Sequence, residues 1–259
     1  MKMSTGLFKS KVCGHRGACG YAPENTFAAF HKALEQGAEW VEFDVQLSAE
    51  GVPIILHDDT LARTSDKGGA RRPTELALSE LKELDAGEWF GSEFAGERIP
   101  TLDELLEEFG QKLELNIEIK SKPNFEADNG IEKMVADAIV QHNLVNRVIV
   151  SSFDPTRLAR LHAYNPTIPL GALYTSKAEE YPPTFDFFQL AEITGAIALH
   201  PHYKVIDEAY MGRARSLGLK VNTWTVNDPE DMTRLAKLGV DIIITNYPDK
   251  LVAALETIG

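Results

Sequence analysis

The chain has 259 residues, and its 39 acidic residues exceed its 26 lysines and arginines, which gives a formal net charge of −13. This length fits one large domain or two small ones, and 44% hydrophobic with 25% charged residues is typical of a globular protein. The acidic balance argues against a nucleic acid as partner, because binding to a duplex needs a basic surface.

Targeting and cross-linking signals are scarce in the sequence. No stretch approaches the ~18 consecutive apolar residues of a membrane span, and the start of the chain lacks the continuous apolar core of a signal peptide. Cys13 and Cys19 are too few for a disulfide framework, and no cysteines or histidines have the spacing of a zinc site. We therefore expect no membrane span and a cytoplasmic location, while the oligomeric state stays open.

Short runs rich in β-branched residues alternate with helical patterns. A helix is predicted over Asn25–Gln36, another over Thr101–Phe109, and two more start at Asp154-Pro155 and Asp228-Pro229, where aspartate precedes a proline in the first helical position. The expected strands are Val12–His15, Trp40–Leu47, Leu113–Lys120, Arg147–Ser151, Ile168–Leu173, Ala196–Leu199, Lys220–Thr225 and Asp241–Thr245. Eight such units predict an α/β fold, a (β/α)8 TIM-like barrel forming a single domain over residues 1–259. A doubly wound open sheet is the alternative.

Residues 58–100 interrupt this alternation. The segment holds two adjacent glycines, a short helical stretch and a Trp89-Phe90-Gly91 turn, and it is too long for a plain strand-to-helix loop. We interpret it as an insertion after the second strand and its hairpin, at the mouth of the barrel. Long loops in that place usually determine substrate selectivity.

The segment 113–120 alternates strictly between apolar and polar residues, which places the two sets on opposite faces of a strand. One interpretation is an antiparallel strand with one solvated face. In a barrel, however, helices cover the outer face, so the polar set points inward. Glu118 and Lys120 are then expected at the mouth, where barrel enzymes carry out their chemistry.

The second predicted strand has the same alternation, so Glu42 and Asp44 share its inner face. Together with Glu118 they would place three carboxylates in one region, where like charges repel one another. One hard divalent cation, Mg²⁺ or Ca²⁺, bound by carboxylate oxygens would remove that repulsion. The alternative is that the three side chains are structural acids in salt bridges.

A hairpin is predicted to follow the second strand, with Gly51 in its turn. If the turn is centred near residues 49–50, the numbers of paired residues sum to about 99 to 101. Asp44 then pairs with Leu56 or His57. The hairpin would therefore return His57 to the level of Glu42 and Asp44, within reach of the proposed metal site.

The first predicted strand ends with His15, and Arg16 follows between two glycines that let the backbone approach a ligand. Arginine is the preferred bidentate partner of phosphate. A cation and Arg16 would neutralise a phosphodiester, while His15 and His57 would divide the roles of general base and general acid. Lys120 would add positive charge beside the phosphate or the leaving oxygen. The predicted mouth thus suits phosphate-ester chemistry.

Six motifs in a fixed order extend over nearly the whole chain. They are GHRG at 14–17, PENT at 23–26, VEFDVQL at 41–47, VPIILHDD at 52–59, NIEIK at 116–120 and NTWTVN at 222–227. In this ordered set the sequence resembles the glycerophosphodiester phosphodiesterase family. The resemblance implies a TIM-like barrel and a metal-dependent hydrolysis of glycerophosphodiesters. Substrates such as glycerophosphocholine or glycerophosphoethanolamine would yield sn-glycerol 3-phosphate and an alcohol.

The resemblance also implies roles for seven residues. The catalytic pair would be His15 and His57, the metal ligands Glu42, Asp44 and Glu118, and the phosphate contacts Arg16 and Lys120. We assign His15 as the base and His57 as the acid. The nucleophile is left open between water and the substrate's own glycerol hydroxyl, which would form a cyclic phosphate.

Two further residues are expected to bind substrate. Trp224 shares a strand face with Asn222 and would pack on the glycerol group, unless it is a core residue. His200 ends the sixth predicted strand and either contacts substrate or is structural. Two other functions remain as alternatives: a related barrel phosphodiesterase for lysophospholipid or phosphoinositide head groups, and a non-catalytic binder of a phosphorylated metabolite.

Overall fold

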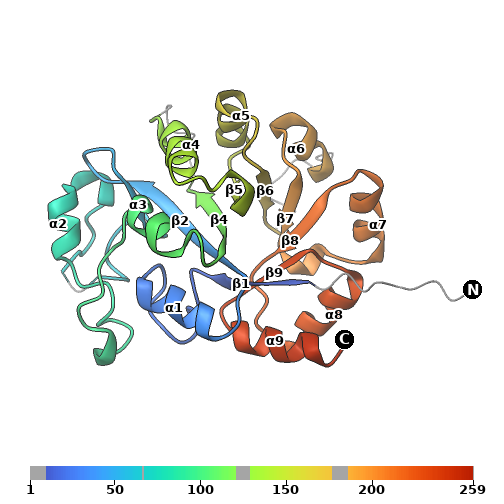
Figure 1. The fold of residues 1–259 in the computed structure, drawn as a ribbon, viewed down its shortest axis with the longest axis horizontal. Coiled ribbons are helices and arrows are strands. Elements are labelled where there is room, and N and C mark those ends of the chain that lie inside the picture. Colours follow the sequence, from blue (N-terminus) through green and yellow to red (C-terminus); the bar gives the residue numbers. More distant parts are fainter. Residues whose placement is uncertain (1–9, 66, 121–128, 177–185, 259) are drawn as a thin grey trace, which may run out of the picture.

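The computed structural model describes residues 10–65, 67–120, 129–176 and 186–258. Eight parallel strands pair side by side, and β1 pairs with both β2 and β9, so the sheet closes on itself (Figure 1). These strands are β1 Lys11–His15, β2 Trp40–Leu47, β4 Glu114–Ile119, β5 Val148–Ser152, β6 Leu170–Tyr174, β7 Ala198–Pro201, β8 Lys220–Thr223 and β9 Ile242–Thr245. The predicted TIM-like barrel is confirmed, and closure through β1 excludes the open sheet.

A helix follows each barrel strand, and the helices surround the strands (Figure 1). Asp154 and Asp228 each cap a helix that begins with proline, as predicted. The eight helices are α1 Phe27–Glu35, α3 Leu102–Phe109, α4 Ile131–Gln141, α5 Pro155–Tyr164, α6 Phe187–Thr194, α7 Glu208–Ser216, α8 Pro229–Leu238 and α9 Pro248–Glu256. The first begins later than predicted, because Asn25 has a left-handed backbone (φ 59°) and Thr26 is the N-cap.

The alternation of apolar and polar residues in the strands separates the core from the barrel interior. Apolar residues of β2 and β4, such as Phe43 and Ile117, are fully buried in the core cluster that also contains residues from the helices. The polar residues between them, such as Asp44 and Glu118, are therefore on the inner face. This arrangement agrees with the period-two pattern of the sequence.

The short strand β3 (Pro53–Ile55) runs antiparallel to β2, and Val45 pairs with Ile55, so the predicted hairpin and its register are present. Residues 58–65 and 67–100 belong to a lobe beside β2, with a helix α2 (Leu78–Glu83) and two 3₁₀ turns, η1 (Pro73–Glu75) and η2 (Ser92–Phe94) (Figure 1). A second, small hydrophobic core packs the lobe against the hairpin. It is formed by Ile54 and Leu56 at β3 together with Leu61, Leu76, Leu81, Leu84, Ala86 and Ile99 of the lobe.

Within the described residues, none of the helices has the length and apolar composition that crossing a membrane would require.

Candidate active site

A cavity of about 210 Å³ lies inside the mouth of the barrel. It is lined by His15, Arg16, Glu42, His57, Asn116, Glu118, Lys120, Phe153, Leu173, Trp224, Thr225 and Ile244. A larger groove, of about 460 Å³, lies on the surface between α6 and α7. We assign the site to the smaller cavity because its lining joins titratable and apolar groups from several strands, as active sites of barrels do.

Three carboxylates converge at this cavity. Glu42, Asp44 and Glu118 are all buried, and each offers an oxygen within 4.8 Å of an oxygen from both others. The register explains their meeting, since Asp44 pairs directly with Glu118 on the neighbouring strand and Glu42 lies two residues earlier. The structure thus brings together the three residues that the sequence predicted as metal ligands.

The charges of this cluster are only partly balanced. Burial raises the pKa of Glu42 well above its usual value, and the neighbouring charges of Asp44 and Glu118 raise it further. The pKa of Asp44 is lowered, because the positive charges of Lys120 and Arg16 outweigh the effect of its burial. Asp44 Oδ1 is buried and accepts no hydrogen bond from any described residue, although Lys120 Nζ lies 3.3 Å away. These oxygens suit a hard divalent cation.

Arg16 and Lys120 approach the cluster from the ends of β1 and β4, the two strands on either side of β2. Arg16 has a left-handed backbone (φ 51°), its N–H donates to Glu42 Oε2 at 3.0 Å, and its Nε lies 3.2 Å from Asp44 Oδ2. Lys120 Nζ donates to Glu118 Oε1 at 2.8 Å. Both side chains are largely buried and both pKa values are raised, because attraction to the carboxylates outweighs the cost of burial. Two fixed positive charges therefore border the cavity.

His15 ends β1, and its ring is held by a residue from the other end of the chain. Its Nδ1 lies 2.7 Å from Asn246 Oδ1. An amide oxygen only accepts, so Nδ1 carries the hydrogen and Nε2 keeps its lone pair when the ring is neutral. Burial, together with the charge of Arg16, lowers the pKa of His15 to about 4. Nε2 therefore carries a lone pair at neutral pH.

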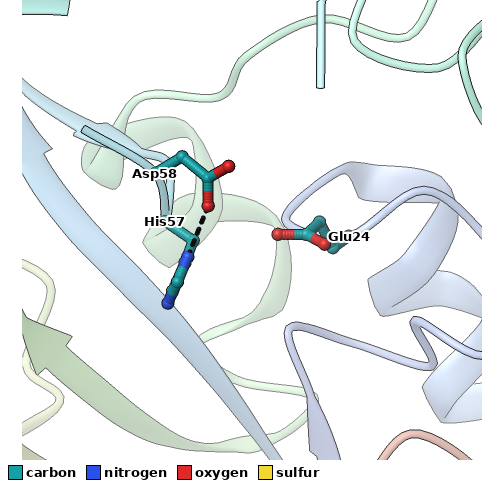
Figure 2. Close-up of side chains that lie close together, drawn as sticks. All are labelled: Glu24, His57 and Asp58. Atoms are coloured by element: carbon teal, nitrogen blue, oxygen red, sulfur yellow. Dashed lines mark hydrogen bonds and ion pairs between the residues drawn. The ribbon is translucent and has the colours of Figure 1, made fainter. Parts of the chain in front are cut away.

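His57 follows β3 and lines the same cavity. Its Nδ1 lies 2.6 Å from Asp58 Oδ1, and Figure 2 shows the other ring nitrogen pointing away from Asp58. The Gln46 side-chain amide donates to the backbone oxygens of Leu56, His57 and Asp58 at 2.9–3.0 Å, which fixes this stretch against β2.

Several residues that the sequence reading did not select support the predicted ones. Asn25 Nδ2 donates to Asp44 Oδ2 at 3.0 Å, and Glu24 pairs with Arg16 at 2.8 Å. Arg63 of the insertion bonds to both Glu24 and Asp58. Asn25 and Glu24 belong to the PENT motif, which was the feature of the sequence that indicated a role for both. Asn246 and Arg63 belong to no motif and to no spacing in the sequence that would have indicated a role in the site.

The two further predicted substrate contacts are placed differently. Trp224 lines the cavity together with Phe153, the two rings meeting edge to face at 5.4 Å. His200 is completely buried below the mouth, with its Nε2 2.9 Å from Asn222 Nδ2, and it is not among the described residues that line the cavity. The structure therefore brings Trp224 to the site and leaves His200 in the barrel interior.

Comparison with known proteins gives consistent matches over the whole barrel. The chain is 41% identical over 246 residues to a glycerophosphodiester phosphodiesterase from Caldanaerobacter subterraneus subsp. tengcongensis, covering 94% of this chain and 97% of that protein. It is similar to a phosphodiesterase structure from Oleispira antarctica, solved in complex with the product sn-glycerol-3-phosphate. There the TM-score is 0.83 at 35% identity, with 96% of this chain and 98% of the other covered.

A glycerophosphoryl diester phosphodiesterase structure from Silicibacter pomeroyi superimposes with a TM-score of 0.87 at 29% identity, covering 97% and 94% of the two chains. The sequence profile of the glycerophosphoryl diester phosphodiesterase family matches residues 15–250, which include both cavity histidines and all three clustered carboxylates. These matches confirm the resemblance noted in the sequence motifs. The chain therefore belongs to the glycerophosphoryl diester phosphodiesterase family of enzymes.

Proposed function

We propose that the protein is a metal-dependent hydrolase that cleaves glycerophosphodiesters into sn-glycerol 3-phosphate and an alcohol. The observation that carries this proposal is a cavity lined by two histidines, one arginine, one lysine and the carboxylates of Glu42 and Glu118, with the buried Asp44 carboxylate within 4.8 Å of both. The product named for the Oleispira antarctica relative supports the glycerol 3-phosphate half of the substrate.

We assign one divalent cation, Mg²⁺ or Ca²⁺, to Glu42, Asp44 and Glu118. The donor set is all oxygen, as these hard cations prefer, and burial together with the negative charges of Asp44 and Glu118 raises the pKa of Glu42. When bound, the cation would supply Lewis-acid stabilisation of charge on a phosphoryl oxygen. The protein's contribution is to hold the three carboxylates at the mouth on paired strands.

His15 acts as the general base in this proposal. Its Nδ1–H donates to Asn246, so the Nε2 lone pair is free to accept a proton from the nucleophile. The low pKa keeps the ring neutral at physiological pH, although it also makes His15 a weak base. The nucleophile is either water or the glycerol hydroxyl of the substrate. Trapping a cyclic glycerophosphate during turnover would identify the second route.

His57 acts as the general acid. The Asp58 carboxylate accepts from its Nδ1 and orients the ring so that Nε2 points away from Asp58. The proton on Nε2 is then available to the leaving alkoxide. The two histidines thus have different partners, a neutral amide for the base and a carboxylate for the acid, which separates their roles.

Arg16 and Lys120 bind the phosphodiester and stabilise the charge that develops on it. Both are held by carboxylates, so their positions are set before substrate arrives. Trp224 and Phe153 form an apolar wall on which the glycerol or the alcohol group packs. The cavity then provides a charged part for the phosphate and an aromatic part for the organic group.

The direct test is release of glycerol 3-phosphate from glycerophosphocholine, measured with and without EDTA. We expect release that stops with EDTA and returns on adding Mg²⁺ or Ca²⁺. Cleavage of lysophosphatidylcholine or a phosphoinositide in preference to glycerophosphocholine would favour the related barrel phosphodiesterase. Binding of glycerol phosphate without turnover of any of these substrates would contradict the proposal and indicate a binding protein.

A further inference from the structure

Arg63, in the lobe of residues 58–100, connects two separate parts of the mouth. Its Nη1 and Nη2 donate to the two carboxylate oxygens of Glu24 at 2.6 and 2.8 Å. Its Nε and Nη2 donate to the two oxygens of Asp58, both at 2.8 Å. One guanidinium group therefore makes a bidentate contact with each of two carboxylates. Figure 2 shows the Glu24 carboxylate pointing toward the side where His57 and Asp58 lie, and the hydrogen bonds from Arg63 join the two carboxylates.

Each of these carboxylates holds a residue of the proposed chemistry. Asp58 accepts from His57 Nδ1 at 2.6 Å, and Glu24 pairs with Arg16 Nη1 at 2.8 Å. Glu24 comes from the loop before α1, whereas Asp58 follows the β2–β3 hairpin. Among the described residues, Arg63 is the one whose side chain bonds to both carboxylates, Glu24 and Asp58. It thereby links the loop that carries the phosphate contact to the loop that carries the proposed acid.

We propose that Arg63 is a positioning residue for the hydrolysis: it fixes His57 and Arg16 relative to each other through Asp58 and Glu24. This inference rests on the proposed function. The lobe would then contribute a residue that supports the active site from outside the cavity. Arg63 does not reach the cavity itself, so its effect passes through its two carboxylate partners.

The geometry distinguishes this arrangement from an ordinary surface ion pair. An exposed pair contributes little to stability, and 43% of the Arg63 side chain is exposed. However, four hydrogen bonds on a planar group fix direction as well as distance, which a lysine cannot do. The Trp89 ring supports the guanidinium, with Arg63 Cζ 5.9 Å from the ring centroid. The hydrogen bonds from Arg63 also lower the pKa of Asp58 to about 2, so Asp58 remains ionised.

Steady-state kinetics of Arg63→Gln and Arg63→Lys on glycerophosphocholine test the proposal. We expect kcat to fall roughly tenfold or more in Arg63→Gln, the equivalent of losing at least one positioning hydrogen bond. Arg63→Lys should be intermediate, since it keeps the charge but not both bidentate contacts. Added guanidinium or methylguanidinium should restore part of the kcat of Arg63→Gln, which would not occur if Arg63 only stabilised the fold. Arg234→Gln, an exposed ion-paired arginine on α8, is the matched control and should keep wild-type kinetics.

Double variants test separately the connection from Arg63 to His57 through Asp58 and the connection to Arg16 through Glu24. If Arg63 acts on His57 through Asp58, its effect on kcat should be much smaller when Asp58→Asn is already present. Its effect on kcat should shrink in the same way in a Glu24→Gln background, because that connection leads to Arg16. Additive effects in both backgrounds would overturn the proposal.

The wild-type protein in the same assay distinguishes a failure of the proposed function from a failure of the positioning role. An inactive wild type would contradict the proposed function. An active wild type with Arg63→Gln within twofold of it would contradict the positioning role alone. Should Arg63→Gln fail to fold in a thermal melt, Arg63→Lys decides the question. Full activity of that variant would exclude a role for the bidentate geometry, and reduced activity with the wild-type melting temperature would support it.

Discussion

His15 and Asn246 are 231 positions apart in the chain, yet His15 Nδ1 lies 2.7 Å from Asn246 Oδ1. The backbone of Asn246 is itself fixed, since its N–H donates to Asn227 Oδ1 at 2.9 Å and its carbonyl accepts from Gly20 at 3.0 Å. The hydrogen bond from His15 therefore ends on a rigid acceptor. This rigidity selects one tautomer and one ring orientation for the proposed base.

Asn246→Leu should lower kcat by roughly tenfold, because one hydrogen bond of about 1.4 kcal/mol would no longer orient His15. The affinity for the cation should stay unchanged, since Asn246 contacts no carboxylate of the cluster in the described structure. Glycerophosphocholine turnover and calorimetric cation binding check the two parts. Asn165→Ala, at the end of α5, is a control. Equal kcat for Asn246→Leu and wild type would contradict this role.

Replacing either cavity histidine should have a larger effect. In His15→Ala and His57→Ala we expect kcat to fall by about 10²- to 10⁴-fold, because each variant lacks one proton-transfer group. Cation binding should persist in both, since neither histidine belongs to the carboxylate cluster. His31→Ala, an exposed histidine on α1, serves as control. Turnover near the wild-type rate in either cavity variant would refute the assignment.

Glu118→Gln should weaken cation binding by at least about tenfold. The variant loses a charged ligand of the ion, which costs more affinity than the loss of a group that only supports a ligand. The variant keeps the size of the side chain, so the barrel should fold normally. Isothermal calorimetry with Mg²⁺ and with Ca²⁺ measures the change and also shows which ion binds more tightly. Glu35→Gln, on an exposed helix surface, should bind the cation as the wild type does. Unaltered affinity in Glu118→Gln would exclude the proposed ligand set.

His200 should make the stability of the fold depend on pH. Burial lowers its pKa from the ordinary 6.5 to about 3. Between pH 6.5 and pH 3 the unfolded chain binds a proton at this residue and the folded protein does not, so acid favours unfolding. The free energy of unfolding should therefore fall as the pH decreases through this window, and the fall should be smaller in His200→Gln. Urea titrations at several pH values measure it, and parallel curves for the two proteins would contradict the prediction.

Gly171→Ala should destabilise the barrel. A Cβ at this position would lie 2.2 Å from His200 Nε2, so the His200 ring would have to leave its contact with Asn222. We expect a loss of roughly 1–3 kcal/mol, as for other overpacked cores. Gly212→Ala is the matched control, because a Cβ there meets no atom within 4 Å and alanine favours helix α7. Equal melting temperatures for both variants would show that the interior adjusts freely.

The barrel could be predicted because its determinants are local. Alternation in residues 41–47 and 113–120 assigns Glu42, Asp44 and Glu118 to the inner face of the barrel. Because the strands are parallel, their carboxyl ends meet at the same mouth, which brings these side chains together. The hairpin was predictable for the same reason, since a short turn fixes the register that brings His57 back beside Asp44. These residues are located by patterns within ten or so positions of themselves.

The remaining parts of the site depend on contacts that no local pattern encodes. Asn246 meets His15 only because β9 pairs with β1. Arg63 meets Glu24 because the lobe folds back over the loop before α1, and its side-chain reach decides the contact. The placement of His200 was also determined by a residue on another strand. His200 ends a predicted strand, but the small size of Gly171 lets the ring turn into the interior.

The position of β1 between β2 and β9 also has a consequence for how the enzyme matures during synthesis. The carboxylate cluster lies on adjacent strands of the first half of the chain, so the ribosome delivers its members early. The acceptor for His15, Asn246, follows β9 and is therefore synthesised after all three carboxylates. A polypeptide cut between β8 and β9 would keep Glu42, Asp44 and Glu118 but would lack both Asn246 and the strand that closes the barrel on β1, so His15 would lose its acceptor and its neighbouring strand together.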